Sequence, residues 1–258
     1  MLTRHLAAAA ALLVAGSAVR AQTAPQHVAE GDSANAALNA SAALMHYQAA
    51  LAVDSNDYSA LWKASREAVS LGEFDSSKTK QMSLYKEGEG YARRAVAVDA
   101  KGSDGWFVLA RALGRTSLTM SSKQRVKYAK EIREDGLTSL KYDSLNAGAL
   151  HVMGRWNAEI MRLSGLTRFF AENFMGAEIF HAASWDSAVF YMNKAVKVDP
   201  TRLVHHLDLG EIYRDRDKKG DAALAKEQLT LVVEGKATEY NDPFYKKQAE
   251  QLLAKLNK

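Results

Sequence analysis

Three arginines recur at matching positions along the chain and carry its clearest potential for binding chemistry. Arg66, Arg111 and Arg155 each lie twelve residues beyond an aspartate that ends a predicted helix. Lys63 lies about one helical turn before the first of them. A guanidinium group can bind a carboxylate or a phosphate through two parallel hydrogen bonds. A row of these cations therefore predicts a site for an acidic peptide, a free C-terminus or a lipid head group.

The alternative is that the same arginines only cover solvated helix surfaces. Arg155 and Glu159 are four residues apart, a spacing at which opposite charges pair along one helix and contribute about 0.2–0.5 kcal/mol. Arginine is also a good helix former on a solvated face. At the fourth aspartate the equivalent position is Glu211, which interrupts the row. The anion-binding hypothesis requires that the three arginines share one face of the folded chain.

Residue patterns typical of catalysis do not occur in the sequence. HExxH, GxSxG and Gly-rich phosphate-binding motifs are missing, and the lack of Cys excludes a thiol nucleophile, a disulfide framework and a Cys-based zinc site. His205 and His206 are adjacent, so on a helix they point about 100° apart and do not easily share one metal ion. We interpret them as an exposed or half-buried pair, and His151 as an interior histidine. The chain is predicted to have no enzymatic activity, no metal ligands and no cofactor.

An apolar segment over residues 165–185 is a second candidate site. Its large apolar residues are Leu166, Phe169, Phe170, Phe174, Ile179, Phe180 and Trp185. A segment of this kind can line a lipid-sized cavity, or insert against a membrane or a partner helix. We favour the simpler interpretation that it forms an extra helix packed on the last repeats, because Phe-rich helical segments more often belong to the core.

An internal repeat supplies the elements that must position these residues. Four predicted helices end on an aspartate, at Asp54, Asp99, Asp143 and Asp199, which are spaced 45, 44 and 56 residues apart. Small residues recur eleven positions after these aspartates, at Ser65, Ala110, Gly154 and Gly210, and four positions before them, at Ala50, Ala95, Ser139 and Ala195. Helices approach one another closely only where side chains are small, so these columns predict helix crossings. Each aspartate is expected to cap the helix that follows it.

The spacing of the small, aromatic and Asp/Pro positions resembles the tetratricopeptide pattern, a helix-turn-helix repeat of roughly 34 residues. The clearest unit runs from Trp185 to Tyr213, through WDSAVFYMNKAVKVDP and LVHHLDLGEIY. The resemblance implies an all-α solenoid of about four helix pairs, with the arginine row on its concave side. Residues 243–258 are expected to form a closing helix, because the last repeat must cover its apolar face.

A narrower resemblance rests on the long intervals, the two SSK inserts and the stretch ALHVMGRWNAEIMRLSGLTRFFAENFMG. Together these features resemble the regulator of microtubule dynamics family over roughly residues 40–256. The resemblance implies a tetratricopeptide-like helical solenoid. In animal relatives it further implies association with microtubules, or with membranes and lipids.

The N-terminus predicts export. Arg4 precedes an apolar run from Leu6 to Ala18, and the small residues Val19 and Ala21 suit a signal peptidase that cuts after Ala21. We therefore predict a signal peptide over 1–21 and a bacterial periplasmic or secreted protein, which would not meet tubulin. Residues 22–35 are polar and aperiodic, which predicts a flexible mature N-terminus, and residues 36–258 form the repeat domain.

These observations predict a non-catalytic scaffold or adaptor that holds a peptide, a protein or an anionic group in a concave groove. Two alternatives stay open: a carrier of a lipid or small amphiphile that uses the insert 165–185, and a microtubule-associated role if the leader does not direct export. A protein or peptide partner is expected first, and a lipid or membrane surface second. Nucleic acid is not expected, because the net charge falls from +4 to only +2 once Arg4 and Arg20 are removed with the leader.

Overall fold

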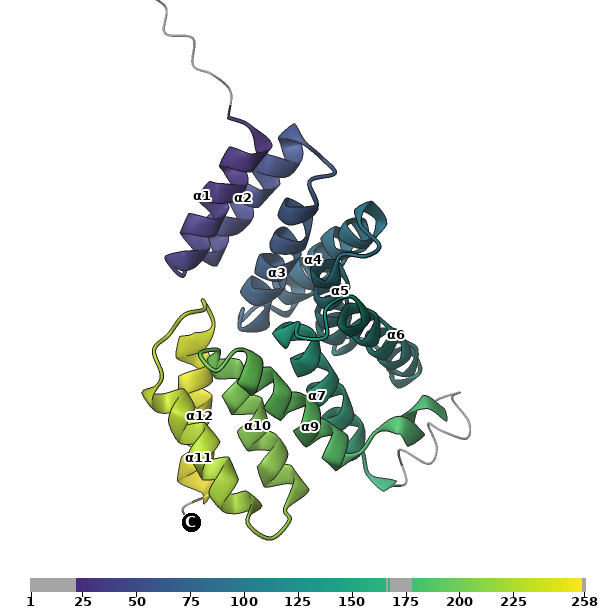
Figure 1. The fold of residues 1–258 in the computed structure, drawn as a ribbon, viewed down its shortest axis with the longest axis vertical. Helices are drawn as coiled ribbons and strands as arrows, with labels where there is room; N and C mark the ends of the chain where they lie inside the picture. Colours follow the sequence, from purple (N-terminus) through teal and green to yellow (C-terminus); the bar gives the residue numbers. More distant parts are fainter. Residues whose placement is uncertain (1–21, 166, 168–177, 257–258) are drawn as a thin grey trace, which may run out of the picture.

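The computed structural model describes residues 22–165, 167 and 178–256, which form α-helices, one short 3-10 helix (η1) and no β-strand (Figure 1). The elements are α1 (Ala24–Ala36), α2 (Ala40–Val53), α3 (Tyr58–Glu73), α4 (Lys78–Val98), α5 (Ser103–Ser117), α6 (Ser122–Tyr142), α7 (Ala147–Arg162), η1 (Glu178–Ala182), α9 (Trp185–Val198), α10 (Leu203–Arg216), α11 (Asp221–Glu234) and α12 (Asp242–Leu256). In this part of the chain no helix is both long and apolar enough to span a membrane.

The helices pack in consecutive hairpins that stack into a solenoid. The pairs are α1 with α2, α3 with α4, α5 with α6, α7 with α9 and α10 with α11 (Figure 1). The first helix of one pair also contacts the first helix of the next, from α3 through α5 and α7 to α10. Helix α12 packs on α10 and α11 and covers the last pair. The predicted all-α, tetratricopeptide-like solenoid with a closing helix is therefore confirmed.

The small residues of the repeat lie where helices cross. A methyl group added to Gly154 would lie 3.2 Å from the backbone nitrogen of Met192 on α9. One added to Gly210 would lie 2.9 Å from Leu229 on α11. Ser65 and Ala110 are fully buried at the equivalent places. At these crossings the two helix backbones come too close for larger side chains, as the sequence columns predicted.

The N-terminal segment differs from its prediction. Residues 22–35 were expected to be flexible, but Ala24–Ala36 forms helix α1. Thr23 and Gln26 form a capping box at its start. The aromatic ring of Tyr47 on α2 lies directly against Gly31, and its hydroxyl donates a hydrogen bond of 2.8 Å to Asp32. The polar composition hid this helix, because its apolar contacts are small and few: Ala24 is buried in the cluster around Tyr47, and Val28 and Ala34 pack half-buried on it.

The repeated aspartates have a different task from the one expected. They end helices α2, α4, α6 and α9 instead of capping the helices that follow. The carboxylate of Asp143, for example, accepts a hydrogen bond of 2.9 Å from the backbone nitrogen of Leu145 and so shapes the turn. Three residues later Asn146 caps α7, and Asp57 caps α3 in the same way. The prediction that the aspartates cap the next helix is therefore wrong, because the capping residue comes three positions later.

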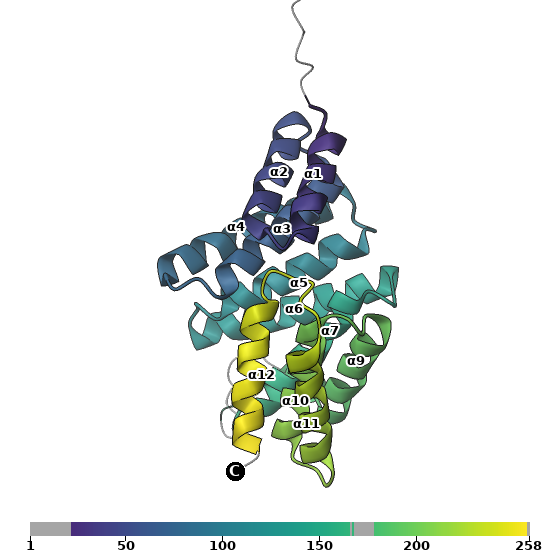
Figure 2. The same ribbon diagram turned by 90° about the vertical axis from the view of Figure 1, so that its left-hand side faces the viewer.

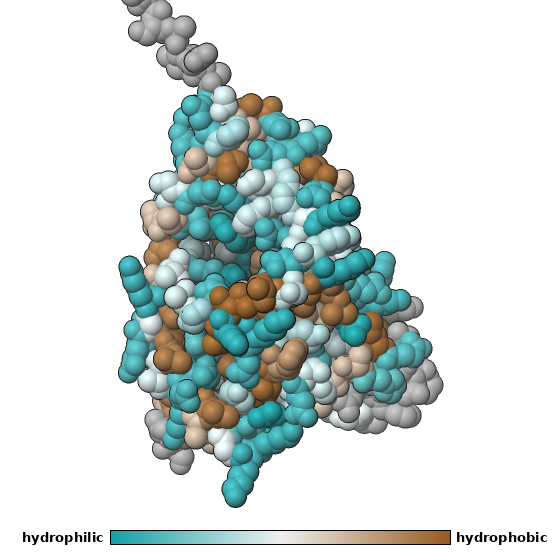
Figure 3. Space-filling model, viewed as in Figure 1, coloured by the Kyte–Doolittle hydropathy of each residue, from teal (hydrophilic) through white to brown (hydrophobic). Residues whose placement is uncertain are grey.

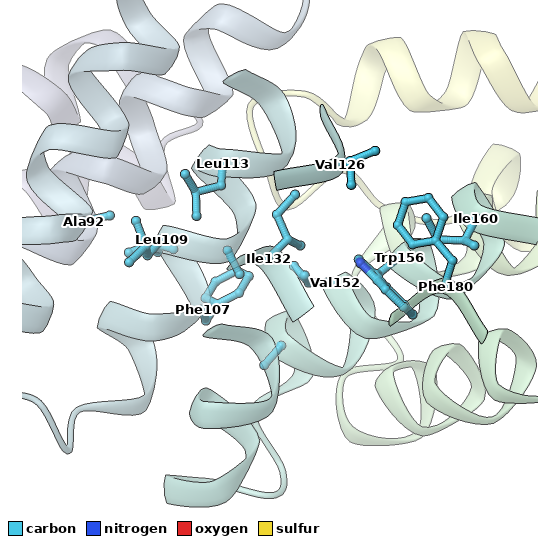
Figure 4. Packing of buried hydrophobic residues seen from close by; sticks show 13 residues of the cluster. Ala92, Phe107, Leu109, Leu113, Val126, Ile132, Val152, Trp156, Ile160 and Phe180 are labelled. Atoms are coloured by element: carbon cyan, nitrogen blue, oxygen red, sulfur yellow. The ribbon is translucent and has the colours of Figure 1, made fainter. Parts of the chain in front are cut away.

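The core consists of a series of apolar clusters along the solenoid. Figure 4 shows one of them, in which Trp156 and Ile160 of α7 pack with Phe180 of η1. Phe180 is buried there, and Trp185 packs half-buried on the cluster around Met192. Both residues therefore pack in the core, although Phe180 lies in the 3-10 helix η1 and joins the cluster of α5 and α7 rather than an extra helix on the last repeats. Phe169, Phe170 and Phe174 lie outside the described residues.

The C-terminal end folds back onto the first half of the molecule. Phe244 at the start of α12 stacks on Phe74 at the end of α3, with ring centroids 4.5 Å apart, and Tyr245 meets the same ring edge-on. The Asn241 side chain donates a hydrogen bond of 3.1 Å to the backbone oxygen of Ser70. The connection between α11 and α12 therefore lies beside α3, as both ribbon views show (Figures 1 and 2).

Candidate functional site

The structure places the predicted arginine row on one side of the solenoid. Arg66, Arg111 and Arg155 lie on α3, α5 and α7, the first helices of three consecutive pairs. Arg111 donates a hydrogen bond of 3.2 Å to the backbone oxygen of Arg66, so these two members of the row are in direct contact. This contact brings Arg66 and Arg111 together, and Arg155 lies on the next first helix of the stack. What the sequence did not show is that the chain supplies its own anions to them.

Each predicted cation is already neutralised by a carboxylate of the same chain. The partners are Asp32 for Lys63 at 2.7 Å, Glu67 for Arg66 at 2.7 Å, Glu73 for Arg111 at 3.6 Å, and Asp208 and Glu159 for Arg155 at 2.7 and 3.0 Å. Several of these pairs join different helix pairs of the solenoid. A ligand carboxylate would have to displace them. The row therefore stabilises the stack of helices, and it offers little free positive charge.

The pair between Arg155 and Asp208 joins a partly exposed guanidinium to a buried carboxylate: the Arg155 side chain is 34% exposed and the Asp208 side chain 4%. Asp208 lies on α10, and His151 approaches its second oxygen to 2.9 Å. Burial alone would raise the pKa of the Asp208 carboxyl, but the Arg155 guanidinium and His151 hold it well below its usual range. Asp208 is therefore a permanent anion in the interior, and Arg155 is committed to it.

A cleft of about 410 Å³ opens on the inner face at the N-terminal ends of α3, α5 and α7. Trp62, Phe107 and Leu145 supply its apolar surface, and Asp104, Asp143 and Asp199 supply carboxylates. Arg66, Arg202 and Glu239 complete its charged lining. Figure 3 shows one face of the molecule with a hollow near its centre, bordered mostly by hydrophilic residues and below by a hydrophobic patch.

The charges of this cleft do not cancel. Arg202 pairs with Glu239 at 2.8 Å, and Arg66 pairs with Glu67. By contrast, none of the three aspartates lies within 4 Å of a Lys or Arg nitrogen in the part of the chain that the structure describes. Asp143 and Asp199 accept hydrogen bonds only from their own turns, and Asp104 accepts one of 3.2 Å from Asn146.

The environment of Asp104 reflects this surplus of negative charge. Burial raises the pKa of its carboxyl most; the hydrogen bond from Asn146 lowers this pKa, the Asp143 carboxylate raises it, and the charges of Arg66 and Lys63 lower it. A cation placed between Asp104 and Asp143 would relieve the two effects that raise this pKa. The cleft is therefore better suited to a positively charged group than to the anion that the arginine row suggested.

The adjacent histidines lie in the interior, which corrects their interpretation as a half-exposed pair. His206 contacts Gln228 at 2.7 Å and the Pro200 backbone oxygen at 2.9 Å. His205 is fully buried, and its ring meets that of His151 edge-on at 4.9 Å. Both faces of α10 are covered, one by α7 and α9 and the other by α11 and α12, so neither histidine reaches solvent. The interior position of His151 agrees with its prediction.

Sequence reasoning missed the acidic side of the cleft. Asp143 and Asp199 were recognised only as helix ends, and Asp104 was not singled out. Asp143 and Asp199 recur as helix ends in the sequence, but Asp104 has no repeated counterpart that could have singled it out. Only the stacking of successive repeats in the folded chain brings these three aspartates to one cleft.

Comparison with known proteins supports the fold. The structure is similar to TTC0263, a thermophilic tetratricopeptide protein from Thermus thermophilus, with a TM-score of 0.63, 17% sequence identity and coverage of 88% of this chain and 99% of that one. It also resembles pilF of Pseudomonas aeruginosa, with a TM-score of 0.50, 12% identity and coverage of 90% and 91%. At these identities the similarity concerns the fold alone.

Sequence comparison identifies the family. No curated protein sequence matches the chain. The family model described as regulator of microtubule dynamics protein 1-3 matches residues 22–257, which include every helix described above. The chain therefore belongs to the regulator of microtubule dynamics protein 1-3 family.

Proposed function

We propose that this protein is a non-catalytic binding scaffold whose inner cleft holds an extended segment of a partner protein that carries Lys or Arg side chains. The observation that supports the proposal most is the group of three carboxylates, Asp104, Asp143 and Asp199, which line the cleft without a basic partner. Stacked helix repeats commonly bind partners on such extended concave surfaces.

The apolar lining fits the same kind of ligand. Leu145 is 58% exposed at the rim, and Trp62 is half-buried beside it. The long aliphatic stem of a Lys or Arg can lie on this surface while its charged end reaches the aspartates. A segment that alternates basic and apolar residues would use both parts of the lining.

An acidic ligand is disfavoured by the pairing of the arginine row. To bind Arg111 or Arg155 it would first have to separate a guanidinium from Glu73 or Asp208. Breaking a buried ion pair costs roughly 3–5 kcal/mol. The carboxylate of the ligand would only restore the interaction that was lost, so binding would bring no net gain there. A basic segment faces no such cost at the three unpaired aspartates.

The interior histidine and carboxylate do not suggest catalysis. His151 and Asp208 approach one another to 2.9 Å, but Asp208 is buried and also bound to Arg155. The pair lies outside the lining of the cleft, so a ligand bound there would not reach it. We therefore assign the cleft to binding alone.

The proposal can be tested with two fluorescein-labelled peptides of equal length, one alternating Lys and Leu and the other alternating Glu and Leu. Fluorescence anisotropy should show tighter binding of the Lys peptide. Asp143→Asn and Asp104→Asn should each weaken it by about 3–10-fold, since a partly buried charge contact contributes about 1 kcal/mol. Both substitutions keep the turn and cap hydrogen bonds, so the fold should persist.

Glu250→Gln on α12 is the matched control, because it removes an exposed carboxylate away from the cleft and should leave the affinity unchanged. Tighter binding of the Glu peptide would overturn the proposal. So would equal loss of affinity in all three variants, which would indicate a general charge effect rather than the cleft.

A further inference from the structure

Two histidines and a glutamate meet between the first two helices, away from the cleft. His27 and Glu30 come from α1, and His46 comes from α2. One potential metal-ligating atom from each residue lies within 4.8 Å of the other two. Glu30 Oε2 is 3.4 Å from His27 Nδ1 and 3.1 Å from His46 Nδ1.

These separations match the edges of a small metal coordination shell. Zinc binds imidazole nitrogen and carboxylate oxygen at about 2.0–2.2 Å, almost always with tetrahedral geometry. Two ligand atoms at that distance and at a tetrahedral angle are about 3.3–3.6 Å apart. The two measured nitrogen–oxygen separations lie at or slightly below this range, so small side-chain adjustments would admit an ion.

The hydrogen bonding of the group leaves the required atoms free. His27 Nδ1 is buried and has no hydrogen-bond partner, which is costly for a polar atom unless something else binds it. The other oxygen of Glu30 accepts a hydrogen bond of 2.5 Å from the Gln22 side chain. That bond orients the carboxylate and leaves Oε2 directed to the histidines, as a supporting residue does around a metal ligand.

The surroundings allow an ion to enter. The side chains of His46 and Glu30 are 30% and 39% exposed, so the group opens to solvent on one side. Helix α1 also has few apolar contacts of its own, since Ala24 and Gly31 are its only buried residues. A metal that joined α1 to α2 would therefore add a link to a helix that buries few residues of its own.

We propose that His27, Glu30 and His46 bind one divalent transition-metal ion with a preference for imidazole ligands, with Zn²⁺ as its test ion. Three protein ligands leave one position for water, and oxygen-preferring ions such as Mg²⁺ and Ca²⁺ fit the site poorly. The ion fastens α1 to α2. This inference does not depend on the proposed binding cleft.

Isothermal titration calorimetry of the full chain without an affinity tag tests the site. Zn²⁺ should bind with one-to-one stoichiometry, whereas Mg²⁺ and Ca²⁺ should not compete with it. Glu30→Gln should weaken Zn²⁺ binding by at least about 10-fold, because even outer-shell substitutions cost 10–100-fold, and His27→Ala/His46→Ala should remove it. Glu250→Gln removes an exposed carboxylate from α12, far from α1 and α2 in the sequence, and should leave the affinity unchanged.

Hydrogen exchange supplies a second measurement. Saturating Zn²⁺ should slow amide exchange in α1 of the native protein but not in the Glu30→Gln variant, and it should leave α12 unaffected. The proposal is overturned if Zn²⁺ does not bind, if Glu30→Gln and the double histidine variant bind it as tightly as the native chain, or if α1 protection is independent of the ion.

Discussion

Arg155 on α7 donates a 2.7 Å hydrogen bond to Oδ1 of Asp208 on α10, and this pair joins two consecutive repeats at the inner face. Because Asp208 is almost fully buried, the contact acts as a structural link between repeats. The pairs of Lys63 with Asp32 and of Arg111 with Glu73 also join different helix pairs, whereas Arg66 pairs with Glu67 on its own helix. The inner face is held together by charges that a sequence pattern alone would assign to a ligand.

Asp208→Asn should destabilise the protein by about 1–3 kcal/mol, because it removes the buried partner of Arg155 while leaving this 34% exposed guanidinium its pairing with Glu159. Urea unfolding followed by circular dichroism measures the change. Lys130→Ala is the control, since Lys130 and Glu134 are largely exposed and 4.0 Å apart, and it should cost less than about 1 kcal/mol. Similar losses in both variants would show that the Arg155 pair is not a structural link.

His205 should make the fold sensitive to mild acid. Its ring is fully buried and neither nitrogen has a hydrogen-bond partner. Burial, with smaller contributions from His151 and Arg202, holds its pKa well below the ordinary value. The unfolded chain binds a proton near pH 6.5 and the folded chain does not, so stability is full above pH 6.5 and falls as the pH drops below it.

His205→Phe should remove part of that fall, by up to about 1.4 kcal/mol per pH unit below pH 6.5. Urea unfolding at pH 7.5, 6.0 and 5.0 gives the slope for each protein. The comparison of slopes isolates His205 from the carboxylates, which titrate in both chains. An unchanged slope would contradict the assignment.

Asp135 should have the opposite pH dependence. It is 6% exposed, and one of its oxygens has no hydrogen-bond partner. Burial raises its pKa to about 7, and the neighbouring Glu131 carboxylate adds to this while Arg93 partly offsets it. Because the folded-state pKa lies above the unfolded value near 3.9, its contribution is most favourable below pH 4 and is lost as the pH rises toward 7.

Asp135→Asn should therefore stabilise the protein at pH 8, by about 1–3 kcal/mol, because it removes a buried charge without a partner. Near pH 4 the effect should largely disappear. Glu134→Gln, at an exposed neighbouring position, should have little effect at either pH. Equal stabilisation by Asp135→Asn at both pH values would show that the carboxyl does not titrate as described.

Export of the chain is a prediction from its first 21 residues and has its own test. Expression with the native leader in a Gram-negative host should yield a periplasmic protein whose N-terminal residue is Gln22, as determined by mass spectrometry. Cleavage there would preserve the hydrogen bond from Gln22 to Glu30. A cytoplasmic protein that retains the leader would contradict export and would return the microtubule-associated role to consideration.

The sequence by itself determined the repeat. The columns of small residues, from Ser65 to Gly210, identified the helix crossings because the distance between two packed helices limits the size of the side chains between them. That limit acts on each residue locally, so it leaves a pattern that can be recognised without coordinates. The family resemblance rested on the long repeat intervals, the two SSK inserts and the stretch ALHVMGRWNAEIMRLSGLTRFFAENFMG, and the family match over residues 22–257 confirms it.

Only the tertiary structure decided which groups meet. Asp208 lies 53 residues from Arg155, and His46 lies 19 residues from His27 on another helix. Helical periodicity places a side chain on a face, but the stacking of repeats decides which side chain of another helix comes opposite it. The pairing of the arginines, the unpaired aspartates of the cleft and the docking of polar helix α1 all depend on that stacking, which no single stretch of residues encodes.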